Sequence, residues 1–495
     1  MQLPVPDPAI LQRRDALVAQ LAARLPAGTV ITKPVQLAAY DGDALSAYRQ
    51  TPLAVILPRS AGEVSAALAL TSELGLKVVP RGAGTSLSGG ALPLADGVVI
   101  ATGKMNRIIA VDIPNRCIVA EPGVTNLALS AAARPHGFFY APDPSSQAAC
   151  TIGGNVAENA GGIHCLKYGV TTNNLLGCEI ALPGGERVRL GGRHGGAGGL
   201  DLLGAVTGSE GLLGIVTEVT VRLVPVPAAT ETIVAAFASV TAAAQCVADI
   251  IAAGIVPAAM EMMDARAAAA IESFCAPGYP EGAAAVLLIE SDGAADDVQS
   301  EAKAIRQIAL KAGALTLDSA ATDEGRAALW AGRKAAFPAA GRLAPDMLCM
   351  DGTIPRRALP KVLAQIAALA AEHGLGVCNV FHAGDGNLHP LILFDRDEPG
   401  ALQKAEALGD AILMLCVKEG GVLSGEHGIG IEKAALMETM FGPDDLAQQA
   451  RFKCAFDPDG RMNPGKVFPV LSACVEGGRM HVHEGRMAFG HLPRL

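Results

Sequence analysis

Short apolar runs separated by glycine-rich turns characterise the first half of the chain. Two such runs lie at 77–79 and 98–100, and a longer one lies at 216–224. Runs of this length bounded by glycine are typical of buried strands, and the helical spacing at 61–74 predicts one of the brief helices between strands. This alternation predicts an α+β domain over residues 51–227.

The pattern changes after the Pro-Val-Pro sequence at 225–227. Long alanine-rich windows with helical spacing then alternate with single strand-like segments. The windows are 235–253, 297–313 and 359–373, and the strand-like segments include 286–290 and 376–381. The pattern predicts a second α+β domain over residues 228–470, in which helices cover one face of an antiparallel sheet.

Two terminal segments flank these predicted domains. Residues 1–50 form an N-terminal helical segment, because charged residues interrupt the apolar stretch at 9–25 as in an amphipathic surface helix rather than a signal peptide. Residues 471–495 form a C-terminal tail that contains His481, His483 and His491. These histidines could bind adventitious metal, but a solvated tail is the simpler interpretation. We therefore expect a cytoplasmic protein.

The composition excludes several classes of protein. The 495 residues allow two or three domains, and no uninterrupted apolar run of about 18 residues predicts a membrane-spanning helix. The net charge of −10 argues against nucleic-acid binding, which needs a clustered basic face. The 11 cysteines include no Cys-x-x-Cys pair, which disfavours zinc ribbons and iron–sulfur clusters and predicts reduced thiols.

The glycine-rich segment at 80–90 carries the strongest local signal, because it connects two strand-like runs. Glycine accepts positive φ and lets backbone N–H groups approach a ligand closely. Successive N–H groups form a concave anion site that suits a pyrophosphate. Leu87 stands where a nicotinamide-binding Rossmann loop has its third glycine, so this loop would hold phosphate in another way. An ordinary glycine-rich turn is the alternative.

Two further glycine-rich segments follow along the chain. Residues 142–162 are so rich in proline and glycine that they leave little room for a helix and predict a chain wrapped closely over a ligand. Their asparagines and backbone donors would suit the polar edge and phosphates of a cofactor. At 208–215 the backbone could pass along a ring system while Ile215 packs on its face. A structural omega loop at 142–162 is the alternative.

Together, segments 81–90, 142–162 and 211–219 resemble the FAD-binding halves of the vanillyl-alcohol-oxidase and p-cresol-methylhydroxylase (PCMH) flavoproteins. The resemblance implies an α+β protein with a PCMH-type FAD-binding domain followed by an α+β substrate or cap domain with an antiparallel sheet. It implies non-covalent FAD, because the glycine-rich loop has no histidine. The residues assigned to the cofactor are Pro80, Arg81, Gly82, Ala83, Gly84, Thr85, Ser86, Pro142, Asp143, Pro144, Ser145, Gly153, Gly154, Asn155, Ala157, Asn159, Gly162, Gly214, Ile215 and Asn463.

A histidine cluster in the second predicted domain carries the candidate chemistry. Strand-like segments flank the tight-turn sequence at 384–387, which would place His382 and His389 directly opposite each other. Cross-strand partners have Cβ atoms about 5 Å apart, so both imidazoles could bind one cation. Glu426, in a glycine-lined loop, would be the third ligand. This set suits zinc, with iron or manganese as alternatives. Histidines that only cap a turn are the competing interpretation.

These segments, with 330–334, 349–357 and 463–466, resemble the D-2-hydroxyacid dehydrogenase branch of the same flavoprotein family. The branch includes D-lactate and D-2-hydroxyglutarate dehydrogenases and the large flavin-bearing subunit of bacterial glycolate oxidase, which the chain resembles most. The resemblance implies oxidation of glycolate to glyoxylate, or of D-lactate to pyruvate. It also implies a complex with a second FAD-binding subunit and an iron–sulfur subunit, which alone would bring the chain to the inner membrane.

The resemblance also implies roles at the reaction centre. Arg333 would pair with the substrate carboxylate, because its planar fork matches two oxygens. The metal would bind the α-hydroxyl and lower its pKa, and His427 would remove that proton as general base. The α-hydrogen would pass as hydride to the flavin N5. Asn387 is counted as substrate-binding, although it and Asp385 could simply build the turn, and Arg333 and His427 could be solvated charges.

Two departures from the 2-hydroxyglutarate enzymes favour a small monocarboxylate. Cys349 stands where those enzymes have lysine, and Phe337 stands where they have threonine. Without a cation and a hydroxyl, a second carboxylate would be desolvated unpaired. The competing functions are a D-lactate dehydrogenase, a non-catalytic FAD-holding subunit, which would be expected to lack these histidines, and a metallohydrolase built on the same three ligands.

Overall fold

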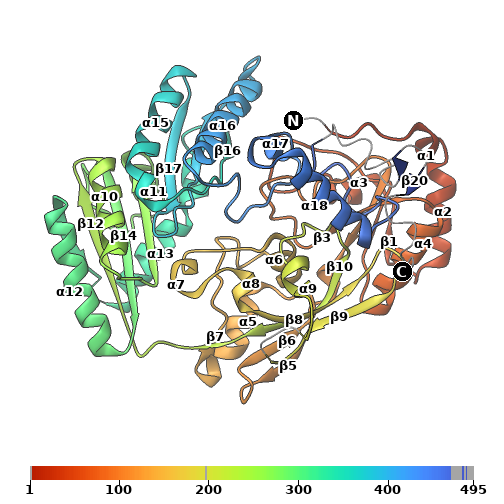
Figure 1. Cartoon of the computed structure of the whole chain (residues 1–495), viewed down its shortest axis with the longest axis horizontal. Helices are drawn as coiled ribbons and strands as arrows, with labels where there is room; N and C mark the ends of the chain where they lie inside the picture. The colour runs from red at the N-terminus through yellow and green to blue at the C-terminus, as the bar shows by residue number, and fades with distance from the viewer. Residues whose placement is uncertain (1–2, 195–197, 321, 470–481, 484–485, 488–495) are drawn as a thin grey trace.

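The computed structural model describes residues 3–194, 198–320, 322–469, 482–483 and 486–487 (Figure 1). Its larger sheets divide the chain into two lobes. The first lobe contains a four-stranded and a five-stranded sheet, and the second lobe contains a seven-stranded sheet. The second lobe lies at the left of Figure 1 and the first lobe at the right.

The four-stranded sheet of the first lobe has the order β1-β2-β4-β3. Strands β2 (Ala54–Ile56), β4 (Gly97–Ala101) and β3 (Lys77–Arg81) are parallel, and β1 (Val30–Ile31) is antiparallel to β2. Helix α4 (Ala61–Glu73) crosses from β2 to β3. Because β2 and β4 are buried along their whole length, they consist of apolar residues and glycine without alternation. Strand β3 leads directly into the glycine-rich loop.

The five-stranded sheet of the first lobe is antiparallel throughout, with the order β5-β6-β10-β8-β9. In that order the strands are β5 (Ile108–Asp112), β6 (Cys117–Ala120), β10 (Ile215–Arg222), β8 (Leu175–Ala181) and β9 (Arg187–Gly191). Helix α5 (Asn126–Ala133) contributes Leu129 and Ala133 to the core of this sheet. Its central strand β10 begins where the third glycine-rich segment ends.

A helix lies within the proline- and glycine-rich segment at 142–162, so the expectation of no helix there is wrong. This helix, α6, spans Ile152–Glu158. Thr151 caps it by accepting a hydrogen bond from the N–H of Gly154 at 3.4 Å. At Gly153 a Cβ would lie 2.6 Å from a proline Cβ. The cap and this close packing therefore outweigh the low helix propensity of glycine.

The seven-stranded sheet of the second lobe has the order β15-β12-β14-β13-β17-β18-β16, and every pairing is antiparallel, as predicted. In that order the strands are β15 (Ala314–Ser319), β12 (Ala229–Phe237), β14 (Ala285–Gly293), β13 (Ala259–Asp264), β17 (Gly376–His382), β18 (Pro390–Phe394) and β16 (Asp346–Cys349). The α+β class inferred from the sequence is confirmed.

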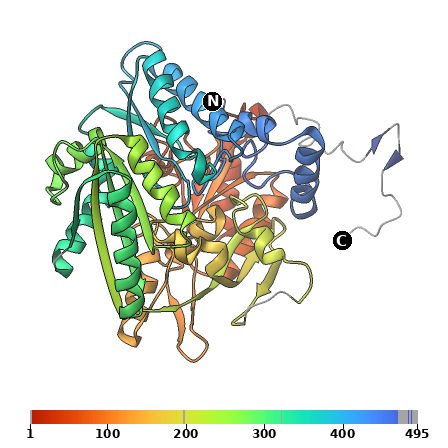
Figure 2. The ribbon, with the colours of Figure 1, turned by 60° about the vertical axis from the view of Figure 1, so that its left-hand side comes forward.

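Helices cover both faces of this sheet, so the expectation of one covered face is wrong (Figure 2). One face packs against α10 (Val240–Ala252), α12 (Ala295–Lys311), α15 (Leu359–Glu372) and α16 (Ala401–Lys418), and the other against α11 (Ala265–Cys275), α13 (Asp323–Lys334) and α14 (Ala336–Ala340). Neighbouring residues such as Ile233 and Val234 belong to opposite cores. A strand buried on both faces needs a continuous apolar run rather than alternation.

The apolar stretch near the N-terminus forms two helices where one was expected. The stretch at 9–25 divides into α1 (Pro8–Gln12) and α2 (Arg14–Arg24). Leu17 and Leu21 of α2 are fully buried in the core of the four-stranded sheet. The helices of this segment are therefore part of the packing of the first lobe.

The chain returns to the first lobe after the second. Helices α17 (Met437–Met440) and α18 (Pro443–Phe456), dark blue in Figure 1, lie toward β3. Beyond α18 the N–H of Val78 donates to the carbonyl of Arg461 at 2.9 Å, and the N–H of Asn463 donates to the carbonyl of Val78 at 2.7 Å. The last part of the segment predicted to form the second domain thus packs on β3.

The predicted tail at 471–495 lies outside the described residues except for β19 (Val482–His483) and β20 (Arg486–Met487), which pair antiparallel. Among the described helices, none combines the length and the apolar character that crossing a membrane requires.

Candidate active site

A cavity of about 470 Å³ lies between the two lobes. The first lobe supplies the glycine-rich loop after β3 and parts of the segments at 142–162 and 208–215. The opposite wall consists of Lys334, Phe337, Pro338, His389, Glu426 and His427. One cavity therefore joins the predicted cofactor segments to the histidine cluster.

The loop after β3 forms a cradle with free donors. Within the described residues, the backbone N–H groups of Ala83, Gly84 and Thr85 have no backbone acceptor. Gly84 has a φ of +76°, and a Cβ there would lie 2.1 Å from Nη2 of Arg81. At Gly82 a Cβ would lie 2.3 Å from a threonine hydroxyl. Exposed N–H groups in a loop that only glycine can form fit the pyrophosphate of FAD.

Most of the predicted cofactor residues line the cavity. They are Pro80, Arg81, Gly82, Ala83, Gly84, Thr85, Ser86, Pro144, Ser145, Gly153, Gly154, Asn155, Ala157, Gly214 and Ile215. At Gly214 φ is +154°, and a Cβ would lie 2.5 Å from the carbonyl oxygen of Ala181 on β8. This glycine thus lets the chain enter β10 beside the cavity.

The remaining predicted cofactor residues are not among the lining residues. They are Pro142, Asp143, Asn159, Gly162 and Asn463. Asn463 supports the cradle from behind, because its Nδ2 donates to the carbonyls of Gly90 at 3.0 Å and Glu210 at 2.7 Å. Asp143 pairs with Nδ1 of His164 at 3.0 Å. These residues hold the loops rather than form the wall.

The carboxyl groups of Glu158 and Glu210 also line the cavity, and the sequence analysis assigned them no role. Burial raises the pKa of Glu158 well above its usual range, and the carboxylate of Glu210 adds to this. Glu210 accepts the N–H groups of Ile429 at 2.6 Å and Gly430 at 2.7 Å, which ties the first lobe to the loop after His427. Glutamates within glycine-dense segments were the available signal.

The hairpin that carries the two histidines has a different register from the one expected. The pairing of β17 with β18 places Asn379 opposite Pro390 and His382 opposite Asn387, so the expectation that His382 faces His389 directly is wrong. His389 is instead the diagonal neighbour on the same face of the sheet. The two rings still approach, with centroids 5.0 Å apart.

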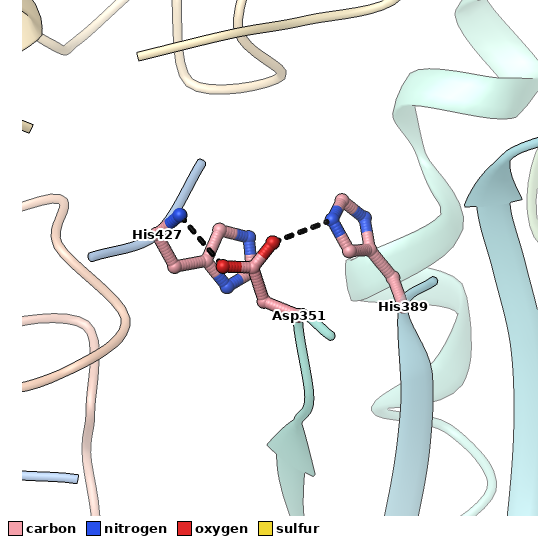
Figure 3. Close-up of side chains that lie close together, drawn as sticks. All are labelled: Asp351, His389 and His427. Atoms are coloured by element: carbon pink, nitrogen blue, oxygen red, sulfur yellow. Dashed lines mark hydrogen bonds and ion pairs between the residues drawn. The ribbon is translucent and has the colours of Figure 1, made fainter. Parts of the chain in front are cut away.

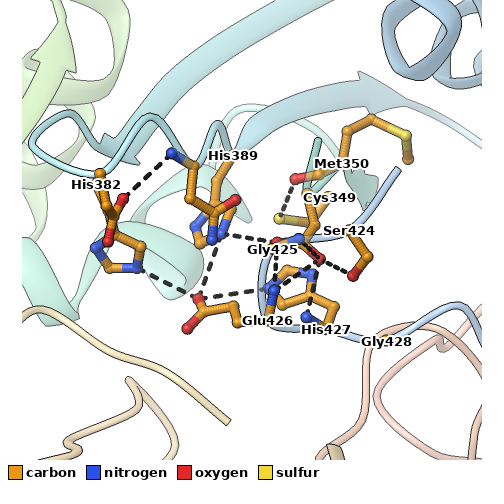
Figure 4. A network of polar contacts seen from close by, with 12 residues as sticks. Cys349, Met350, His382, His389, Ser424, Gly425, Glu426, His427 and Gly428 are labelled. Atoms are coloured by element: carbon orange, nitrogen blue, oxygen red, sulfur yellow. Dashed lines mark hydrogen bonds and ion pairs between the residues drawn. The ribbon is translucent and has the colours of Figure 1, made fainter. Parts of the chain in front are cut away.

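Glu426 meets both histidines (Figure 4). Its Oε1 lies 3.3 Å from Nε2 of His382 and 3.3 Å from Nε2 of His389. The ligand atoms of the three residues all lie within 4.8 Å of one another. Burial alone would raise the pKa of Glu426, but the neighbouring histidines lower it to about 2. An ionised carboxylate between two imidazole nitrogens fits a divalent cation.

Asp351 organises the loop that carries Glu426 and His427, and the sequence analysis did not assign it a role. Its fully buried carboxylate accepts hydrogen bonds from Ser424, Gly425, Glu426 and His427. The bond from the N–H of His427 measures 2.8 Å, and Nε2 of His389 lies 3.5 Å away (Figure 3). A single acidic residue at the end of an apolar strand was the available signal.

His427 faces the cavity, as its predicted role requires. Its ring stacks on that of His389 with centroids 4.8 Å apart. Its Nδ1 is buried and has no hydrogen-bond partner within the described residues. Burial lowers the pKa of His427 to about 4, although the carboxylate of Asp351 acts in the opposite direction.

Arg333 and Asn387 lie behind the cavity wall. Arg333 is 2% exposed, and its Nη2 forms an ion pair with Oε2 of Glu261 at 2.6 Å. Its Nε has no hydrogen-bond acceptor among the described residues, so this donor is available. Asn387 is also buried, and its Oδ1 has no donor in the same part of the chain. Neither is a lining residue.

The cradle, the cavity and the two-lobed fold together define a flavoprotein of the PCMH type. Two family models match the chain: the FAD binding domain at residues 52–191 and the C-terminal domain of FAD linked oxidases at residues 226–467. The chain therefore belongs to the FAD-linked oxidase family and has an FAD-binding domain.

Curated relatives match nearly the whole chain. The glycolate oxidase subunit GlcD of Escherichia coli (strain K12) is 50% identical over 482 residues, with 97% of each chain covered. GlcD of Bacillus subtilis (strain 168) is 40% identical, with 87% of this chain and 92% of the relative covered. A D-lactate dehydrogenase of Archaeoglobus fulgidus is 34% identical, with 84% of this chain and 91% of the relative covered.

Solved structures with low sequence identity show the same fold. The 4-ethylphenol oxidase of Gulosibacter chungangensis has a TM-score of 0.80 at 18% identity, with 95% of this chain and 100% of the other covered. p-Cresol methylhydroxylase has a TM-score of 0.77 at 17% identity, with 94% of this chain and 98% of the other covered. The PCMH-type fold inferred from the sequence is confirmed.

Proposed function

We propose that this chain oxidises a small 2-hydroxy acid with FAD, most simply glycolate to glyoxylate. The observation that carries the proposal is the single cavity lined both by the glycine cradle and by His389, Glu426 and His427. Hydride transfer requires the donor carbon of the substrate and the acceptor atom of the cofactor to lie close together in one site. The glycolate oxidase subunits among the relatives support the choice of substrate.

Different residues of the chain have different roles in the proposed reaction. When bound, FAD supplies the acceptor for the hydride that leaves the α-carbon, and a divalent cation supplies charge for the α-hydroxyl oxygen. His382, His389 and Glu426 would hold that cation, with zinc preferred over iron or manganese. His427 takes the hydroxyl proton as general base, for which its cavity position and unpartnered Nδ1 suit it.

Arg333 binds the substrate carboxylate. Its Nε lacks an acceptor in the described part of the chain, and a carboxylate can accept from the free edge of a guanidinium. Asn387, buried opposite His382, supports the same region. Because Arg333 is not among the lining residues, this role requires a local rearrangement of the cavity wall when substrate binds.

The size of the substrate follows from the wall of the cavity. Phe337 and Pro338 line it and offer no hydrogen-bond donor. Lys334, a cation of the same wall, already pairs with Asp143 at 3.5 Å. Cys349 lies outside the lining, and its buried thiol donates to the carbonyl of Met350 at 3.5 Å. A second carboxylate would lose its hydration without gaining a partner at these positions. A monocarboxylate is therefore preferred.

A D-lactate dehydrogenase is the second candidate, supported by the D-lactate dehydrogenase among the relatives. The same residues would do the same chemistry on a substrate with one more methyl group. The converging histidines argue against a non-catalytic FAD-holding subunit. The FAD-binding domain argues against a metallohydrolase.

The proposal includes a complex. A relative at 50% identity is a subunit of glycolate oxidase, which supports assembly with other subunits. We assign this chain the catalytic role beside a second FAD-binding subunit and an iron–sulfur subunit that takes the electrons onward. The complex would lie in the cytoplasm, attached to the inner membrane only through those partners.

Anaerobic mixing with substrate tests the function. The purified holoprotein is mixed with glycolate, D-lactate or L-lactate, and loss of the flavin absorbance is followed. Glycolate should bleach the flavin fastest, and faster bleaching by D-lactate would favour the second candidate. The His382→Ala variant should retain FAD without bleaching. His373→Ala is the matched control, because His373 caps its own helix with Nδ1 2.9 Å from the carbonyl of Leu369. No bleaching of the wild type by any 2-hydroxy acid would contradict the proposal.

A further inference from the structure

Glu261 is a buried carboxylate that the proposed chemistry does not yet use. It lies on β13, and its side chain is 1% exposed. The pairing of β13 with β17 places Glu261 directly opposite His382. A fully buried carboxylate is costly unless its oxygens are paired, so its partners define its role.

The two oxygens of Glu261 serve two different residues. Oε1 lies 2.7 Å from Nδ1 of His382, and Oε2 lies 2.6 Å from Nη2 of Arg333. The first contact favours the tautomer of His382 with its proton on Nδ1, which leaves the lone pair of Nε2, 3.3 Å from Glu426, for the proposed cation. The second contact gives the buried guanidinium its counter-charge and fixes which of its edges remains free.

These contacts link two functions that the sequence presents as separate. Arg333 comes from α13, and His382 comes from the end of β17. Residues of both elements pack in the same hydrophobic core, and the carboxylate of Glu261 directly bridges the two polar side chains. It therefore links the proposed metal ligand to the proposed carboxylate-binding group.

We propose that Glu261 is a positioning residue that orients His382 for the metal and Arg333 for the substrate carboxylate. The inference rests on the proposed function for its substrate half and on the donor cluster alone for its metal half. A purely structural ion pair would predict no specific change in either affinity once the protein is folded and loaded with FAD.

Three variants and one control separate these contributions. Glu261→Gln keeps the volume and one acceptor but removes the charge. Arg333→Gln removes the other charge, and the double variant leaves no uncompensated buried charge, so it guards against misfolding. Glu290→Gln is the control, because Glu290 is a buried carboxylate on the neighbouring strand whose partners include Trp330 at 2.6 Å rather than the cluster.

Two measurements are made on each FAD-loaded protein. The first is the affinity for Zn²⁺, from competition with a chelator. The second is flavin reduction at saturating Zn²⁺ over a range of glycolate concentrations, which gives both the dissociation constant of glycolate and the limiting rate. Glu261→Gln should weaken Zn²⁺ binding by about 10-fold or more, a typical effect of losing a residue that orients a metal ligand. Arg333→Gln should leave Zn²⁺ affinity within about twofold, because it does not touch His382.

The glycolate measurement tests the second arm. Glu261→Gln should raise the dissociation constant more than it lowers the limiting rate, and the double variant should bind glycolate no more weakly than Arg333→Gln. Unchanged Zn²⁺ affinity in Glu261→Gln, or an equal loss in the Glu290→Gln control, would overturn the proposal. If glycolate fails to reduce the wild-type flavin, the proposed function fails, while the Zn²⁺ measurement still decides the role of Glu261.

Discussion

Replacing Asp351 by asparagine should destabilise the loop that carries Glu426 and His427. The side chain of Asp351 is fully buried and accepts the N–H of Gly425 at 3.1 Å and the N–H of His427 at 2.8 Å. It also pairs with Nζ of Lys433 at 3.4 Å. Asparagine has nearly the same shape, but an NH₂ group replaces one carboxylate oxygen. That NH₂ group would face the N–H and ammonium donors that Asp351 now pairs with.

The expected loss of stability follows from these contacts. Breaking a buried ion pair by removing one partner costs about 3–5 kcal/mol, because the remaining charge stays buried. The entropy of unfolding is about 2.1 cal/mol/K per residue, or about 1 kcal/mol/K for a chain of 495 residues. The melting temperature of the holoprotein should therefore fall by about 3–5 °C.

The assay is thermal unfolding of the FAD-loaded protein, followed by flavin fluorescence and by circular dichroism. Glu73→Gln is the control, because Glu73 pairs at 2.5 Å with Arg24 and the two side chains are 57% and 47% exposed. Such an exposed pair contributes little to stability, so the control should melt within about 1 °C of the wild type. A shift of that small size for Asp351→Asn would refute the argument that Asp351 holds the loop.

Three further predictions concern the base, a buried histidine and the cofactor cradle. His427→Ala should slow flavin reduction by about 10²–10⁴-fold, as expected for loss of a general base, while the FAD content stays unchanged; a normal reduction rate would exclude that role. Burial alone lowers the pKa of His164, but two neighbouring carboxylates raise it from 6.5 to about 10. The charged imidazole therefore stabilises the fold fully below pH 6.5, and this contribution disappears as the pH rises through 10. Melting curves should show the largest deficit of His164→Asn at pH 6 and almost none at pH 10, and a deficit independent of pH would contradict this. Gly214→Ala, with a φ of +154° and a carbonyl 2.5 Å from the new Cβ, should weaken FAD binding by about 10-fold or more, given about 1–3 kcal/mol of backbone strain. Gly103→Ala meets nothing within 4 Å and should bind FAD normally, and equal FAD content in both variants would exclude the strain argument.

The loops that line the cavity could be predicted from the sequence because their signal is local. Gly82 and Gly84 were predicted to lie where the backbone approaches a ligand, and both line the cavity. The helix at Ile152–Glu158 was missed because its stability comes from the Thr151 cap and from packing, which composition alone does not reveal.

The turn sequence at 384–387 correctly predicted that His382 and His389 are neighbours but gave the wrong strand register. The N–H of Gly386 donates to the carbonyl of His382 at 3.2 Å, so the turn begins one residue earlier than the tight-turn sequence suggested. His382 and His389 nevertheless share a face, because side chains on a strand alternate with a period of two. A shift of the pairing by two residues keeps both histidines on the same face, so the cluster still forms.

Residue types and spacing alone determined which glycine-rich segments line the cavity and which histidines gather, since glycine and the period of a strand act over a few residues. The roles of Asp351, Glu210 and Glu261 could be inferred only from the tertiary structure. Each is a single acidic residue in the sequence, and each is buried against partners up to 220 positions away. A buried charge is specified by what surrounds it in space, and only the folded chain brings those surroundings together.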